Sequence, residues 1–120
     1  MNTKPEFDRP ACQPGEHPHR QFPNLSDHAL GRAARLFRAL GDVARLKTLA
    51  LLGEGPACVS ELAATEHENI STVSQRLKVL RLENLVSRSR HGKHIRYALA
   101  DQHVAELVVN ALAHASEPLG

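Results

Sequence analysis

The sequence predicts a mainly helical domain with one small β-hairpin, preceded by a mobile arm. Of the 120 residues, 42% are hydrophobic but only 3% are aromatic. The core must therefore be built from Leu, Val and Ala, a composition that favours helices. Apolar residues recur at helical spacing in several segments after residue 25, whereas residues 94–99 alternate with a period of two. The length suits a single domain with a modest core.

The first 24 residues contain five prolines and little hydrophobic periodicity, so we expect a flexible arm over 1–24 and a folded domain over 25–120. Cys12, His17 and His19 lie close enough together in this arm to share a metal ion. The alternative is a polar tail that binds nothing.

Two helices open the folded domain. The first is expected from Ser26 to Leu40, with Ser26 or Asp27 as its N-cap. The second follows Asp42, which caps it, and the Gly and Pro residues of 53–56 end it. We expect its apolar face to consist of Val43, Leu46, Leu49 and Ala50.

Two shorter helices, joined by a tight turn, come next. The first of them begins at Cys58 and breaks around His67. Asn69 caps the second. The expected buried stripe of the second helix consists of Ile70, Val73, Leu77 and Leu80. This is the layout of a helix-turn-helix. The outer side of the second helix carries side chains that can bond base edges and phosphates, unless it is simply a solvated face. These are Ser71, Thr72, Ser74, Gln75 and Lys78, with Arg76 and Arg81 as further candidates.

A basic β-hairpin follows, with a turn at Gly92 and with Ile95, Tyr97 and Leu99 on one side of its second strand. Residues 76–96 hold seven Lys or Arg against one Glu, although the whole chain carries a net charge of only +2. A basic hairpin after a helix-turn-helix is a winged helix, in which one helix enters the major groove and the wing contacts phosphates. The expected wing contacts are Arg88, Arg90, Lys93 and Arg96.

The last helix carries a pattern of potential metal ligands. Asp101 is its N-cap, and His103 and His114 lie within roughly 20° of each other around the axis but roughly 16 Å apart along it. Metal ligands lie about 2 Å from the ion, so one straight helix cannot bring both imidazoles to the same ion.

Two antiparallel copies of this helix can bring both imidazoles to the same ion. In a two-fold dimer, Asp101 and His103 of one chain meet His114 and Glu117 of the other, which gives two equivalent sites. Two imidazoles and two carboxylates suit tetrahedral Zn²⁺ or Co²⁺. The alternative is four solvated polar residues on an ordinary terminal helix.

Three segments resemble the ArsR/SmtB family of metal-sensing transcriptional repressors: residues 36–46, 85–88 and 92–97. The resemblance extends over about 33–117, and the four ligands of the last helix match the zinc-sensing branch. It implies a winged-helix dimer that binds operator DNA when metal-free and releases it when metal binds. The sequence departs from the family at Val43, where Pro is common, and at His67 and Glu68, where Gly and an apolar residue are usual. Since His tolerates positive φ, we expect the turn to survive.

The resemblance also implies a second site between the arm and the helix-turn-helix. Ser60 stands where arsenic and cadmium sensors have a second Cys, which disfavours a soft-metal sensor. The ligands of this second site would be Cys12, His17, Cys58 and Glu61, with His19 as a substitute for His17.

The sequence therefore predicts a homodimeric repressor of double-stranded operator DNA, released by Zn²⁺, with Co²⁺ and Cd²⁺ as alternatives. A rival interpretation is a thiol switch in which Cys12 and Cys58 form a disulfide. An enzyme is not expected, because no separate general base or substrate-pocket motif is evident. Two cysteines and the lack of any long apolar run indicate a cytoplasmic protein with no membrane partner.

Overall fold

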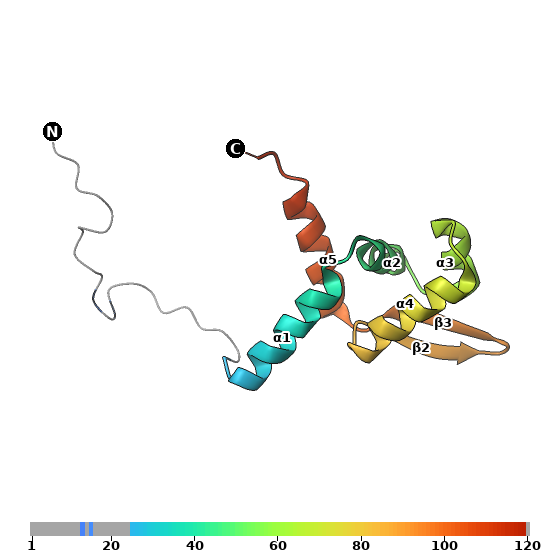
Figure 1. The fold of residues 1–120 in the computed structure, drawn as a ribbon, viewed down its shortest axis with the longest axis horizontal. Coiled ribbons are helices and arrows are strands. Elements are labelled where there is room, and N and C mark those ends of the chain that lie inside the picture. Colours follow the sequence, from blue (N-terminus) through green and yellow to red (C-terminus); the bar gives the residue numbers. More distant parts are fainter. Residues whose placement is uncertain (1–12, 14, 16–24, 120) are drawn as a thin grey trace.

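The computed structural model describes residues 13, 15 and 25–119, which form five helices and a three-stranded antiparallel sheet (Figure 1). The proposed ligands Cys12, His17 and His19 lie outside the described residues, as does most of the predicted arm. The elements in chain order are α1 (Asp27–Leu40), α2 (Val43–Gly53), β1 (Ala57–Cys58), α3 (Val59–Glu66), α4 (Ile70–Leu82), β2 (Val86–His91), β3 (His94–Leu99) and α5 (Gln102–Ala115). The predicted helices and the hairpin are confirmed.

Side chains cap three of the helices as the sequence predicts. Ser26, Asp42 and Asp101 each accept a hydrogen bond from the backbone N–H three residues later, at 3.2, 3.0 and 3.0 Å. Asn69 occupies the N-cap position of α4 but makes no side-chain capping bond. In the turn before it, His67 adopts the expected left-handed conformation with φ of 55°.

The core lies where α2, α4 and the start of the hairpin meet. Its fully buried apolar side chains are Leu49, Val73, Leu77, Leu80 and Leu85. Two members of the predicted apolar faces are instead exposed: Val43 at 84% and Ile70 at 55%. Each is the first residue of its helix, where the neighbouring elements no longer cover the side chain.

The sheet has the order β1-β3-β2, so β3 is its central strand. β2 and β3 pair from Val86 opposite Leu99 to His91 opposite His94, and Gly92 closes the turn with φ of 64°. Strand β1 has only two residues and is not predicted by the sequence pattern. It places Cys58 opposite Arg96.

Helices α1 and α5 project away from the body formed by α2, α3, α4 and the hairpin (Figure 1). Both carry exposed large apolar side chains: Leu30 and Phe37 on α1, and Val109 and Leu112 on α5. Only the first half of α5 reaches the core, through Val104 and Val108. In the part of the chain that is described, no helix has the length and hydropathy needed to cross a membrane.

Candidate DNA-binding surface and metal ligands

Helix α4 presents a polar surface opposite its buried stripe. The five side chains predicted for DNA contact are all exposed: Ser71, Thr72, Ser74, Gln75 and Lys78. The last three of these, together with Arg81, Arg88 and Tyr97, line a shallow cavity of about 140 Å³ between α4 and the hairpin. Helix and wing therefore form one continuous surface.

The four predicted wing contacts are exposed, but they fall on different faces of the hairpin. Arg88 lies opposite Tyr97, and Arg90 lies opposite Ile95, so both arginines lie on the face that looks toward α4. Arg96 alternates to the other face, where its Nη2 donates a hydrogen bond to the Pro56 carbonyl at 3.4 Å.

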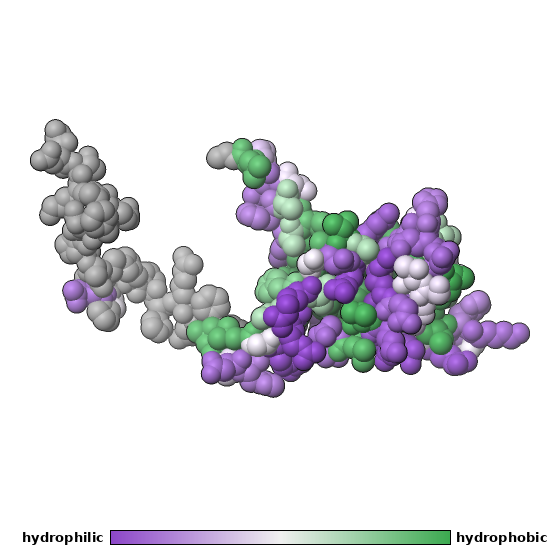
Figure 2. Space-filling model, viewed as in Figure 1, coloured by the Kyte–Doolittle hydropathy of each residue, from purple (hydrophilic) through white to green (hydrophobic). Residues whose placement is uncertain are grey.

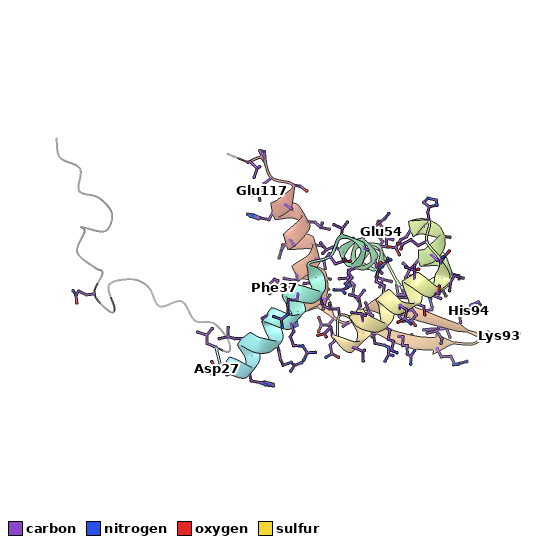
Figure 3. All side chains as sticks on the ribbon, viewed as in Figure 1. Asp27, Phe37, Glu54, Lys93, His94 and Glu117 are labelled. Carbon is purple, nitrogen blue, oxygen red and sulfur yellow. The ribbon has the colours of Figure 1, made fainter. Side chains whose placement is uncertain are left out.

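Lys93 lies at the tip of the hairpin, which is strongly hydrophilic (Figures 2 and 3). Arg88, Arg90 and Lys93 therefore extend the surface of α4, whereas Arg96 lies behind it.

Arg76 is expected from the sequence as a further candidate for DNA contact on the outer side of α4, but its side chain is not part of that surface. Its side chain is only 9% exposed and is held among acceptors from three elements. Nη2 donates to Glu68 Oε2 at 2.7 Å, and Nη1 donates to Glu66 Oε2 at 3.4 Å and to Thr48 Oγ1 at 3.3 Å. The Thr48 hydroxyl in turn donates to Glu66 Oε1 at 2.8 Å.

We call Thr48, Glu66, Glu68 and Arg76 the buried polar network. It joins α2, the end of α3, the turn and α4, and the Glu66 side chain in it is 1% exposed. The hydrogen bond between Arg76 and Glu68 raises the pKa of the guanidinium and lowers the pKa of the Glu68 carboxyl. Arg76 therefore lies inside the fold and ties α4 to α2 and α3.

The ligands predicted on the last helix form two exposed pairs at its two ends. His103 Nδ1 lies 4.0 Å from Asp101 Oδ2, and His114 Nδ1 lies 3.5 Å from Glu117 Oε2. Two ligands of one tetrahedral zinc ion are about 3.4 Å apart, so both pairs are close to chelating distance. Asp101 Oδ1 accepts the Val104 N–H at 3.0 Å, which fixes the carboxylate and leaves Oδ2 for a ligand role.

Each pair supplies two of the four ligands that a tetrahedral metal site needs. In the described part of the chain, no three His, Cys, Asp or Glu side chains come together in a way that could hold an ion. This agrees with the helical geometry, which separates His103 from His114 along α5. Beside Asp101 and His103 there is a cavity of about 550 Å³, bounded by α1, the end of α4 and the start of α5. Imidazole and carboxylate donors at this separation are of the type that zinc accepts, and the described residues offer no third or fourth ligand beside either pair.

The described half of the predicted second site lies at the start of α3. Glu61 Oε1 accepts the backbone N–H of Cys58 at 3.0 Å, which chiefly lowers the pKa of this carboxyl. Desolvation raises the pKa of the Cys58 thiol, and the neighbouring Glu61 raises it further, whereas Arg96 opposes the shift. A raised thiol pKa lowers the fraction of reactive thiolate, so Cys58 offers no support for a thiol switch.

An exposed polar helix in a helix-turn-helix, flanked by a basic hairpin, defines a winged-helix DNA-binding protein. Residues 42–88 match the family described as bacterial regulatory protein, arsR family. The chain is 39% identical over 90 residues to the HTH-type transcriptional regulator NmtR of Mycobacterium tuberculosis, a match that covers 75% of each protein. The chain belongs to the ArsR family.

Two further similarities agree with this assignment. The chain is 40% identical over 88 residues to the HTH-type transcriptional repressor SmtB of M. tuberculosis; the match covers 73% of this chain and 65% of that repressor. A homodimeric winged helix-turn-helix DNA-binding domain from Mycobacterium bovis, a possible ArsR-family transcriptional regulator, superimposes with a TM-score of 0.73. It is 31% identical and covers 82% of this chain and 94% of the domain.

Proposed function

We propose that this protein is a metal-responsive transcriptional repressor that binds operator DNA as a homodimer and releases it when Zn²⁺, or a similar divalent ion such as Co²⁺ or Cd²⁺, binds. One observation carries the proposal. Two exposed carboxylate–imidazole pairs lie at opposite ends of α5, each close to chelating distance, and the described residues provide neither pair with a further ligand. A second copy of the chain can complete both pairs at once, because each end of one α5 carries the two ligands that the opposite end of the other α5 needs.

An antiparallel pair of α5 helices supplies the missing ligands. The exposed apolar side chains of α1 and α5 give these helices a surface for a second copy. In that dimer, Asp101 and His103 of one chain would meet the partner's His114 and Glu117. A bound divalent ion would cross-link the two chains at this point. The cavity beside Asp101 and His103 gives space for the end of the other helix.

The DNA contacts divide by chemistry. On α4, Ser74 and Gln75 can hydrogen-bond base edges, and on the wing Arg90 and Lys93 can bind phosphates. Helix α5 packs on α2, and its first turn shares the large cavity with the end of α4. Metal binding at the ligand pairs would thus change the position of the two α4 helices, which contact the DNA bases. By linkage, DNA must weaken metal binding by the factor with which metal weakens DNA binding, typically about 5–150.

A complementation experiment tests whether the site is shared. His103→Ala and His114→Ala homodimers should each lose tight zinc binding, because each loses one imidazole from both sites. A mixed dimer with one chain of each kind should regain one tight site, since one of its two sites keeps all four ligands. Competition against a chromophoric zinc chelator counts these sites.

The matched control is His91→Ala, which removes an exposed wing imidazole and should leave zinc binding unchanged. Subunit exchange is followed by mass spectrometry of differently labelled chains. If exchange occurs and the mixture still has no tight site, the ligands are not shared across the dimer and the proposed mechanism fails.

A further inference from the structure

Ile70, the first residue of α4, is an apolar side chain that the core does not take up. Periodicity groups it with Val73, Leu77 and Leu80, yet those three are completely buried and Ile70 is 55% exposed. At about 100° per residue, Ile70 lies roughly 50° from the centre of the buried stripe, on the side of Ser74. It therefore forms the apolar border of the surface predicted to contact DNA.

Ile70 is remote from the surface where we propose the second copy. That surface includes Phe37 on α1 and Leu112 on α5, and its cavity reaches α4 only at the end that carries Leu82. Ile70 and Leu82 are the first and last residues of α4 and lie about 18 Å apart along it. Dimerisation through α1 and α5 would leave Ile70 exposed.

The side chain lies in line with predicted DNA contacts. Ile70, Ser74 and Lys78 follow one another at four-residue intervals on α4, and all three are exposed. Ser74 and Lys78 border the cavity shared with Arg88 of the wing, so the row runs along the joint surface of helix and wing. Ile70 is at the N-terminal end of this row, and N-terminal residues of a recognition helix contact base edges.

We propose that Ile70 is a specificity-determining residue that packs on the C5-methyl group of one thymine in each half-site. The methyl group of thymine is the apolar feature that the major groove displays, and a branched hydrocarbon side chain can make only this kind of base contact. The inference rests on the proposed DNA binding, and it adds a base preference that the polar side chains of α4 do not supply.

The experiment uses the full-length chain and DNA duplexes selected from a randomised library. Each thymine of the selected half-site is replaced in turn by deoxyuridine, which lacks only the methyl group. At one position this replacement should weaken DNA binding by the unchanged protein about fourfold per half-site. Fourfold is the change in affinity expected from the burial of one methyl group. Ile70→Ala should bind the thymine and deoxyuridine duplexes equally. Lys78→Ala, the matched control in the same row, should bind both more weakly but keep the fourfold difference.

The outcomes separate this inference from the proposed function. If Ile70→Ala keeps the same preference for thymine, or if no thymine is sensitive in the unchanged protein, the assignment of Ile70 is wrong although sequence-specific repression survives. If the unchanged protein selects no sequence at all, the proposed DNA binding fails, and the role of Ile70 fails with it.

Discussion

Replacing Arg76 by Met should destabilise the protein through the charge that it leaves behind. The methionine side chain fills most of the same space, but the Glu66 carboxylate, only 1% exposed, then has no positive partner. Breaking a buried ion pair on one side costs about 3–5 kcal/mol. Thr48 is not orphaned, because its hydroxyl also lies 3.1 Å from the Ala44 carbonyl and can donate to it.

Urea unfolding at fixed protein concentration measures this loss. With an m value of about 2 kcal/mol per molar, the midpoint should fall by about 2 M. Arg88→Met is the matched control, since this exposed arginine has no such buried partner in the described structure. Its free energy of unfolding should stay within about 0.5 kcal/mol of the original.

A double substitution, Arg76→Met with Glu66→Leu, separates the unpaired charge from lost packing. Removing both charges should recover most of the stability, because apolar side chains can replace a buried ion pair with little or no loss. A loss in the single variant no larger than that of Arg88→Met, or a double variant as unstable as the single one, would refute the assignment of Arg76 to a buried ion pair.

Three further predictions concern the wing, the second site and acid stability. Lys93→Ala should weaken binding to all DNA sequences alike and reduce the salt dependence of binding by about one unit, as measured by anisotropy at several salt concentrations; a loss confined to one sequence would contradict a phosphate contact. If Cys58 is a metal ligand, Cd²⁺ should produce a thiolate charge-transfer absorption that falls in Cys58→Ser, and an unchanged spectrum would exclude Cys58 from the site. Because Arg76 lowers the pKa of Glu68 below its ordinary value of 4.5, Glu68→Gln should be less stable than the original at neutral pH. Urea unfolding should show this difference shrinking as the pH falls below about 4.5 towards the lowered pKa, whereas a constant difference would argue against the ion pair.

The elements that local patterns determine could be predicted from the sequence. Capping residues such as Asp42 and Asp101 mark helix starts, and their bonds depend on residues only three positions away. The two ligand pairs on α5 could also be predicted from the sequence, because the rise and turn of a helix determine which side chains lie at the same end. What the chain alone could not show is the distance of 3.5 Å or 4.0 Å within each pair.

The features that could not be predicted from the sequence depend on contacts between distant segments. Strand β1 has two residues and no pattern of its own, and it exists because β3, about forty positions later, pairs with it. Arg76 has the polar character of an outward residue, and its burial depends on Thr48 and the two carboxylates that surround it. Periodicity also cannot tell whether neighbouring elements cover the first residue of an apolar stripe. It therefore predicts a buried Ile70, whereas the structure shows this side chain exposed.

The two ends of α4 lie in different parts of the molecule. Its last residue, Leu82, borders the cavity that also contains Asp101 and His103, and its first residue, Ile70, begins the row of predicted base contacts. A rod about 18 Å long that pivots at one end by about 10° moves its other end by about 3 Å. That displacement is close to the 3.4 Å rise between successive bases of one DNA strand. A small tilt at the ligand end would therefore shift the reading end by nearly one base step.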